Sequence, residues 1–174
     1  MESFTHHLGS INQLNLSRNN LSLSGADYLA SVIPAMRSIK QLILNDCHLG
    51  DRGVKVILQK LEESTSLDVL DFSANQIGQS SYFKDSAAAL CSYLQKATQL
   101  SDLMLNHNML RGPQGLLICD TISQHSTLAN LELSNNFLGQ QGACIEPPAA
   151  LFARMLIASR FLEKLDLGYN QIDR

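Results

Sequence analysis

Leucine and other apolar residues recur along the chain in one fixed frame. In the clearest copy, residues 128–138 read LANLELSNNFL, which is Leu-x-x-Leu-x-Leu-x-x-Asn-x-Leu. Six copies of this frame begin at residues 11, 39, 67, 100, 128 and 162. A step of about 30 residues is typical of repeat proteins that stack one supersecondary unit per copy. The pattern therefore predicts a solenoid rather than a globular fold without repeats.

Each copy depends on its neighbours to bury its apolar side. A strand with one apolar face cannot bury that face alone, whereas stacked copies close a continuous core. We therefore expect every apolar residue of the frame to be buried. These residues are Leu14, Leu16 and Leu21; Leu42, Leu44 and Leu49; Leu70, Phe72 and Ile77; Leu103, Leu105 and Leu110; Leu131, Leu133 and Leu138; and Leu165, Leu167 and Ile172.

The second half of each copy predicts a helix, the first of them beginning at Gly25. Apolar residues there follow the i, i+3, i+4, i+7 spacing of one buried stripe. The five stripes are Ala26, Leu29, Ala30 and Ile33; Val54, Ile57, Leu58 and Leu61; Ala87, Leu90, Cys91 and Leu94; Gly115, Ile118, Cys119 and Ile122; and Ala149, Phe152, Ala153 and Leu156. The chain thus predicts five strand–loop–helix units and a sixth strand.

These units predict one domain over residues 1–174, in which residues 1–10 close the first copy through Phe4 and Leu8. The sixth copy has no helix after it, because the sequence stops at Arg174. A solenoid end needs a polar cap. We therefore expect a longer native chain, or a partner that covers this end.

The ninth position of the frame holds Asn or Cys. An amide or thiol there can donate to backbone carbonyls that are left unpaired where a strand becomes a loop. The six residues are Asn19, Cys47, Asn75, Asn108, Asn136 and Asn170.

This alternation resembles the ribonuclease-inhibitor class of leucine-rich repeats, over residues 11–174. The resemblance implies an α/β solenoid, a short horseshoe arc with a parallel sheet on its concave face and helices on its convex face. It also implies a role in binding proteins. The many amides and serines are similar to those of leucine-rich-repeat effectors that bacteria deliver into host cells.

Composition narrows the possible partners. Hydrophobic residues make up 45% of the 174 residues and charged residues 17%, which suits a packed core. The formal net charge of -3 provides no bulk positive field, so nucleic acid is not an expected partner. No apolar run reaches the roughly 18 residues of a membrane span. Residues 1–10 lack the apolar core of a signal peptide, so we expect a cytoplasmic protein.

The sequence gives no basis for an enzyme, a metal site or a cofactor. The four cysteines Cys47, Cys91, Cys119 and Cys144 form no C-x-x-C pair and are expected to be free, buried thiols. The pair His6-His7 is too small a set for a metal. His107 has no Ser or Cys nucleophile beside it in the frame.

The side chains between the frame leucines point out of the concave face, because strand residues alternate sides. Seven acids stand there against three bases, Arg18, Lys40 and Lys164. The apolar side chains of Ile43 and Met104 sit in the middle of this face, which favours a contact patch over an ordinary mixed strand surface. The predicted binding residues on this face are Asn15, Ile43, Asp46, Val69, Asp71, Asp102, Met104, His107, Glu132, Asp166 and Tyr169.

Two copies, those that begin at Leu67 and Leu128, are longer than the others. The inserts fall near residues 79–85 and 140–147, on the rim formed by the strand-to-helix loops. The adjacent aromatic residues Tyr82 and Phe83 suit binding anchors, although simple loop growth explains the first insert equally well. Pro147-Pro148 is expected to start the following helix.

These features favour a module that docks a folded partner with a basic surface in the concave face. By its resemblance to ribonuclease inhibitor, the docking would occlude an enzyme's active site. One alternative is a regulator of a small GTPase, because Ran GTPase-activating proteins share this repeat class and Arg18 and Arg111 lie near the rim; their acidic C-terminal tail is absent here. Another is a scaffold or a fragment of a larger sensor. The oligomeric state stays open.

Overall fold

A computed structural model describes residues 8–62, 67–140 and 148–172. Six strands form one parallel sheet in the order in which they occur along the chain. Each strand begins two residues after the start of a predicted frame, so the six-copy frame is confirmed. The strands are β1 (Gln13–Asn15), β2 (Gln41–Ile43), β3 (Val69–Asp71), β4 (Asp102–Met104), β5 (Asn130–Glu132) and β6 (Lys164–Asp166).

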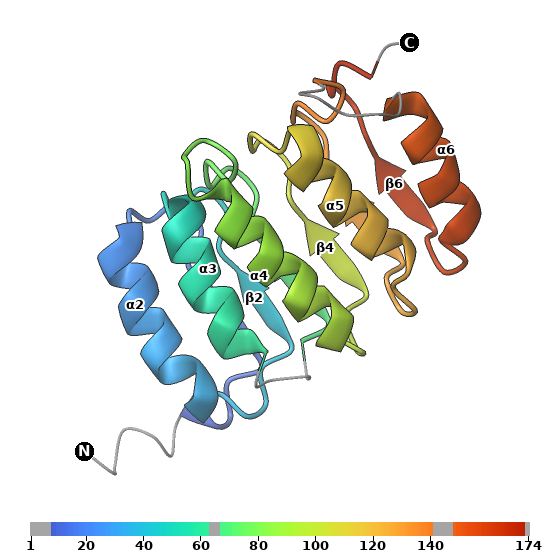
Figure 1. The fold of residues 1–174 in the computed structure, drawn as a ribbon. Helices are drawn as coiled ribbons and strands as arrows, with labels where there is room; N and C mark the ends of the chain where they lie inside the picture. Colours follow the sequence, from blue (N-terminus) through green and yellow to red (C-terminus); the bar gives the residue numbers. More distant parts are fainter. Residues whose placement is uncertain (1–7, 63–66, 141–147, 173–174) are drawn as a thin grey trace.

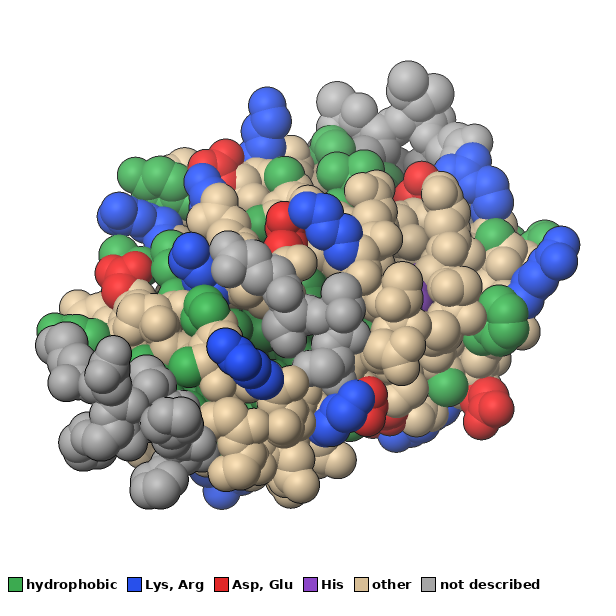
Figure 2. All heavy atoms as spheres, turned by 90° about the horizontal axis from the view of Figure 1, so that it is seen from below, with side chains coloured by type: hydrophobic (Ala, Val, Ile, Leu, Met, Phe, Trp, Pro, Cys, Tyr) green, Lys and Arg blue, Asp and Glu red, His purple; other side chains and the backbone are tan. Residues whose placement is uncertain are grey.

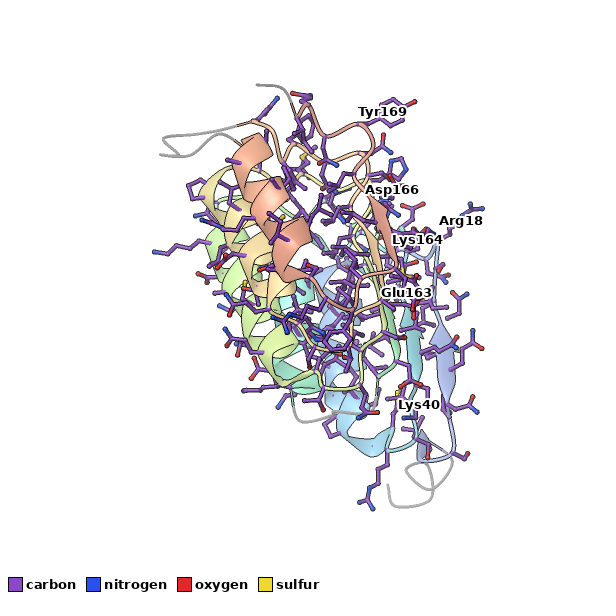
Figure 3. All side chains as sticks on the ribbon, turned by 90° about the vertical axis from the view of Figure 1, so that its right-hand side faces the viewer. Arg18, Lys40, Glu163, Lys164, Asp166 and Tyr169 are labelled. Atoms are coloured by element: carbon purple, nitrogen blue, oxygen red, sulfur yellow. The ribbon has the colours of Figure 1, made fainter. Side chains whose placement is uncertain are left out.

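A helix follows each of the first five strands and packs beside the helix of the next copy. The helices are α2 (Ser22–Val32), α3 (Gly50–Leu61), α4 (Phe83–Lys96), α5 (Gly112–Ser123) and α6 (Pro148–Ala158), with a short 3-10 helix η1 (Ile33–Ala35) after α2. They form one layer in front of the sheet, with the strand-to-helix loops at the upper rim and the helix-to-strand loops at the lower rim (Figure 1). Figure 3 shows the same two layers from the side.

The start of the first helix was predicted three residues too late. The Gly25 N–H donates to the Leu21 carbonyl at 2.8 Å, which is a helical i to i−4 bond, so the first turn precedes Gly25. The start of the last helix is as predicted, because α6 begins at Pro148. Proline suits a first helical turn because its missing N–H would have no partner there.

The four buried stripes predicted before the last are confirmed in full, with Ile33 of the first stripe lying in η1. The stripe of α6 is wrong in part. Phe152 and Met155 are buried there, whereas Ala149, Ala153 and Leu156 are exposed. Among the described residues α6 packs against a helix on one side only, α5, so its buried strip turns toward that neighbour.

The frame residues of the four middle copies are buried as predicted, but those of the two end copies are not. Leu14 and Leu16 in the first copy, and Leu165 and Leu167 in the sixth, are only half-buried. Among the described residues, each end copy has a stacked copy on one side only, so part of its apolar surface lacks the neighbour that the middle copies have. Leu8 packs against the first copy as expected, and Phe4 lies outside the described residues.

The helix-to-strand rim shows charged side chains of both signs, scattered rather than gathered in one patch (Figure 2). No helix in the described part of the chain is long and apolar enough to cross a membrane.

Candidate protein-binding face and its rim

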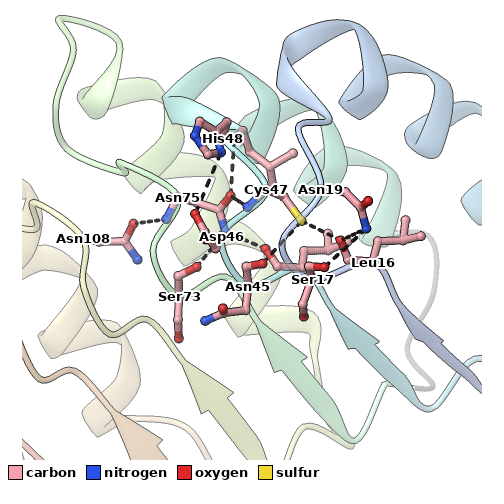
Figure 4. A network of polar contacts seen from close by, with 12 residues as sticks. Leu16, Ser17, Asn19, Asn45, Asp46, Cys47, His48, Ser73, Asn75 and Asn108 are labelled. Carbon is pink, nitrogen blue, oxygen red and sulfur yellow. Dashed lines mark hydrogen bonds and ion pairs between the residues drawn. The ribbon is translucent and has the colours of Figure 1, made fainter.

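A column of asparagines ties each strand-to-helix turn to the next copy. Asn75 donates to the Leu44 carbonyl at 2.7 Å and accepts the Cys47 N–H at 3.1 Å. In turn, Asn108 accepts the Asn75 N–H at 3.0 Å, so the amides link successive copies (Figure 4). This confirms the role predicted for the ninth frame position, and it makes the turns behind the concave face a continuous bonded layer.

Cys47 occupies the same position and bonds in the same way. Its Sγ donates to the Leu16 carbonyl at 3.1 Å and lies 3.6 Å from the Asn45 carbonyl (Figure 4). Burial raises the pKa of the Cys47 thiol, so sulfur keeps the proton that it donates. A thiol therefore replaces an amide at one step of the column, as the sequence predicts.

The other described cysteines are buried in the helices. Cys91 and Cys119 are free thiols, and burial raises the pKa of Cys119 to about 12. A thiol with so high a pKa is a poor nucleophile at neutral pH. Cys144 lies outside the described residues, as does the pair His6-His7.

The sheet register places the predicted central column of side chains in line. Asn15 pairs with Ile43, Ile43 with Asp71, and Asp71 with Met104. The column continues through Glu132 to Asp166 in the same register. Neighbouring strands lie about 4.8 Å apart, so these six side chains stand in one row across the concave face.

The apolar patch on this face is smaller than the sequence suggests. Ile43, Val69 and Met104 are half-buried rather than fully exposed. The reason is that each lies between side chains of the adjacent strands, such as Asp71, which pairs with both Ile43 and Met104. The patch therefore offers apolar surface only between polar groups.

Two of the three bases on the concave face are used within the molecule. The Lys164 Nζ lies 2.5 Å from Glu132 Oε1, and Lys40 Nζ lies 3.6 Å from Asp68 Oδ1. The bond from Lys164 lowers the pKa of Glu132, with a smaller contribution from Asn106, which donates to Glu132 at 2.7 Å. Figure 3 shows Lys40 and Lys164 on the side of the sheet away from the helices.

Three of the other acids on this face are held by neutral donors. Asp71 accepts the Ser73 N–H at 2.8 Å, Asp166 accepts the Gly168 N–H at 2.9 Å, and Asp102 accepts the Asn130 side-chain amide at 2.5 Å. None of these three has an ion-pair partner among the described residues. Neutral donors fix the direction of a carboxylate but leave its charge in place. The face is therefore acidic and pre-oriented.

The residue at the eighth frame position adopts a left-handed backbone in every copy, although none of these residues is glycine. The six are Arg18 (φ 60°), Asp46 (53°), Ala74 (56°), His107 (53°), Asn135 (55°) and Tyr169 (55°). Such a conformation is uncommon outside glycine, so its recurrence is imposed by the turn after each strand. It places three predicted binding residues, Asp46, His107 and Tyr169, where the concave face meets the rim. Nothing in the residue types signals this turn.

The side chains at this turn differ in how they are held. Tyr169 is 85% exposed. Asp46 lies 3.8 Å from His48, measured from Oδ1 to Nδ1. The His107 Nε2 lies 3.5 Å from the Asn135 side-chain nitrogen, as expected for neighbours in adjacent copies.

The first insert presents one aromatic residue, not two. Tyr82 is 49% exposed, and the Arg52 guanidinium lies 5.2 Å from the centroid of its ring. Phe83, predicted as a second anchor, is only 7% exposed. As the first residue of α4, it turns into the core, so the prediction of a contact role for Phe83 is wrong. The second insert, apart from Gln140, lies outside the described residues.

Sequence reasoning missed the residue that holds this insert. Asp51, in the first turn of α3, is 3% exposed. Its Oδ1 accepts the Gly78 N–H at 2.9 Å and the Ser86 hydroxyl at 2.7 Å. Its Oδ2 accepts the N–H and hydroxyl of Ser80, at 3.0 and 2.7 Å. The sequence signal for these hydrogen bonds was the group of serines in the insert, which follows an acid in the preceding helix.

Removing the Asp51 carboxylate is expected to loosen the insert. Asp51→Ala leaves four donors without their acceptor, three of them from Gly78 and Ser80. The net loss is about 2 to 3 kcal/mol, because hydrogen bonds to a charged group are stronger than neutral ones. Urea denaturation would measure the loss, and amide exchange should quicken at Gly78 and Ser80. Exchange that stays slow at both amides would show that the carboxylate does not hold the loop.

The two rim arginines do not converge on one point. Arg18 follows β1 and Arg111 follows β4, three strand spacings away, which is roughly 14 Å. Within the described ranges, no group of three His, Cys, Asp or Glu side chains could hold a metal ion.

Comparison with known proteins agrees with the repeat frame. A family described as Leucine Rich repeat matches residues 10–30, 35–58 and 158–173. Ribonuclease inhibitor of Mus musculus is 23% identical over 182 residues, which cover 90% of this chain and 40% of that relative. The chain thus spans well under half the length of this curated relative.

Two solved structures share the architecture. The leiomodin-1 Actin-Binding Site 2 domain has a TM-score of 0.62 at 13% identity, covering 91% of this chain and 86% of that one. The tropomodulin C-terminal domain of Caenorhabditis elegans has a TM-score of 0.63 at 18% identity, covering 90% and 89%. The repeat sequence, the six-stranded parallel sheet and these likenesses together show a leucine-rich repeat fold, and the chain has distant sequence similarity to ribonuclease inhibitor.

Proposed function

We propose that this chain is a protein-binding module that docks a basic surface of a folded partner against its concave face. The observation that carries the proposal is the set of acids that form no ion pair among the described residues, Asp71, Asp102 and Asp166, beside the half-buried Ile43 and Met104. Interfaces commonly place a few desolvated anchors inside a polar rim. On this face the small apolar patches provide the anchors, and the row of acids provides the polar rim.

An interface of standard size would take in the rim as well as the strands. Six strands about 4.8 Å apart span roughly 24 Å, and strands of three residues are roughly 10 Å long, whereas a standard interface buries about 800 Å² on each partner. The acids also favour association with a positive surface before contact is made. The names of two similar proteins support a binding role, since one is an inhibitor of ribonuclease and the other an actin-binding site.

Truncation in the middle of the face is expected to weaken the partner complex most. Asp71→Ala and Met104→Ala should each cost more than about 1 kcal/mol, because both lie at the centre of the row. The matched control is Asn12→Ala, since Asn12 is exposed at the edge of the sheet and should matter little. Affinity capture with mass spectrometry would identify the partner, and calorimetry would measure each variant. Large losses confined to the convex helices would refute the concave face as the site.

The finer proposal is that docking blocks an active site of the partner. It follows the likeness to ribonuclease inhibitor and suits a partner enzyme whose cleft is lined by basic groups. Activity of the captured partner should fall as the protein is added, and Asp71→Lys should restore that activity. Asp71 is the better site for charge reversal, because Glu132 also holds Lys164 and its replacement would disturb both.

Tyr82 is proposed as an accessory contact on the rim. Its ring is exposed, and the chain from Asp51 to Ser80 to the Tyr82 N–H fixes its position, the last bond being 3.2 Å long. Rigid aromatic side chains lose little entropy on binding.

A further inference from the structure

A cavity of about 510 Å³ opens on the strand-to-helix rim between the third and fourth copies. It lies at the starts of α4 and α5, beside the loop that Asp51 holds. Among the residues that the structure describes, its lining includes two cationic side chains and no carboxylate. The lining residues that matter here are Ser81, Lys84, Arg111, Gly112, Gln114 and Gln140.

Neither cation forms an ion pair among the described residues, although the charge of Lys84 acts at longer range on its sequence neighbour Asp85. This sets Lys84 and Arg111 apart from several other lysines of the chain. Lys55, for example, lies 2.9 Å from an Asp85 carboxylate oxygen, and Lys96 lies 2.6 Å from Glu62. Two cations that form no ion pair within the described ranges thus line one hollow in a chain whose net charge is negative.

The backbone at this hollow is also open. Neither α4 nor α5 has a side-chain cap. The N–H groups of Lys84 and Gln114, in the first turns of these helices, donate no hydrogen bond within the described part of the chain. Gly112 has φ +58°, and a Cβ added there would meet nothing within 4 Å. Backbone donors, and space beside them, are therefore available to a ligand.

We propose that this rim pocket binds a phosphate monoester. A phosphate oxygen pair matches the planar fork of Arg111, and Lys84 supplies a second charge. The open N–H groups at the positive ends of two helices supply further donors to the same group. The hollow is largely open to solvent, so the group that carries the phosphate can extend out of it.

This site is distinct from the concave face, since it takes a ligand of the opposite charge. The phosphate could belong to a phosphorylated side chain of a protein or to a free phosphorylated metabolite. The pocket would bind the phosphate group of either ligand in the same way. The molecule that carries the phosphate, a peptide or a nucleotide, therefore distinguishes the two sources in the experiment.

Nuclear magnetic resonance titration tests the pocket directly. Labelled protein would be titrated with inorganic phosphate, with a capped phosphoserine peptide and with adenosine monophosphate, at constant ionic strength. Saturable shifts are expected at the amides of Ser81, Lys84, Gly112 and Gln114. Lys84→Ala with Arg111→Ala should weaken binding by at least about tenfold, which corresponds to 1.4 kcal/mol.

A charge-matched control separates the pocket from general electrostatics. Arg37→Ala with Lys96→Ala also removes two cations, both near the opposite rim, and should leave the titration unchanged. The carrier that binds at least about tenfold more tightly than inorganic phosphate identifies the source.

Three results would overturn the proposal. They are an absence of saturable shifts, equal weakening in both double variants, and binding of neither carrier more tightly than inorganic phosphate. The exposed positions of Lys84 and Arg111 mean that the variant should fold, and an unchanged melting temperature would show that it does.

Discussion

Leu105→Asp is expected to unfold the middle of the solenoid. Leu105 is completely buried, in the fourth of six stacked copies. A carboxylate there would be surrounded by the apolar frame residues of both neighbours, with no cation to pair with it. Burying it would cost several kcal/mol or force its protonation. Because domains are stable by only about 5 to 15 kcal/mol, one such change removes much of the total.

The same substitution at the equivalent position of the first copy provides the control. Leu16 holds the equivalent frame position in the first copy but is only half-buried. Leu16→Asp can leave its charge in contact with water, so the loss should be far smaller. Circular dichroism during urea denaturation would compare the two midpoints. If both variants melted like the parent protein, the frame assignment would be refuted.

The frame was predictable because two periods coincide in it. Alternation within a strand decides which side chains face the core, and the repeat length decides which residues meet across strands. Together they place Leu70 beside Leu103 and Asp71 beside Met104, as the register shows. The acidic row could therefore be located from spacing alone.

The ends of the solenoid could not be predicted in the same way. The sequence of α6 carries apolar residues on several sides, and which of them are buried depends on the neighbours present. Leu156 is 53% exposed and Ile157 is 84% exposed, whereas Met155, outside the predicted stripe, is buried. A repeat pattern describes a unit with neighbours on both sides, so it overestimates burial where one is missing.

The rim was the second place where sequence reasoning fell short. Tyr82 and Phe83 are adjacent aromatic residues in one insert, yet only one is exposed. Which of the two is exposed depends on where α4 begins. The extra residues of the insert make that start impossible to place from the repeat pattern. Asp51 looked like an ordinary acid in a helical first turn, because its four donors come from residues about 30 positions later along the chain. Loop contacts between copies do not recur at a fixed spacing along the sequence, so the repeat pattern does not predict them.

Asn108→Ala is expected to be the most damaging change among the polar residues. Asn108 is 3% exposed, and its Oδ1 accepts the N–H groups of Asn75 and Ile77, both at 3.0 Å. Its Nδ2 donates to the Phe72 carbonyl at 3.1 Å and to the Leu105 carbonyl at 3.0 Å. Alanine leaves these buried groups unpaired, at an expected cost of about 3 to 4 kcal/mol.

The first copy again supplies the matched comparison for this substitution. Asn19 holds the same frame position but is exposed, and among the described residues its side-chain amide bonds within its own copy, to the Leu16 carbonyl at 2.9 Å and the Ser17 carbonyl at 3.3 Å. Asn19→Ala should therefore cost less than about 1 kcal/mol, since water can replace the lost amide. Equal losses for Asn19 and Asn108 would mean that the amide column acts within each turn rather than between copies. A larger loss for Asn108→Ala would instead show that the column ties each copy to the one before it, and so fixes the turns from which the acidic face and its rim project.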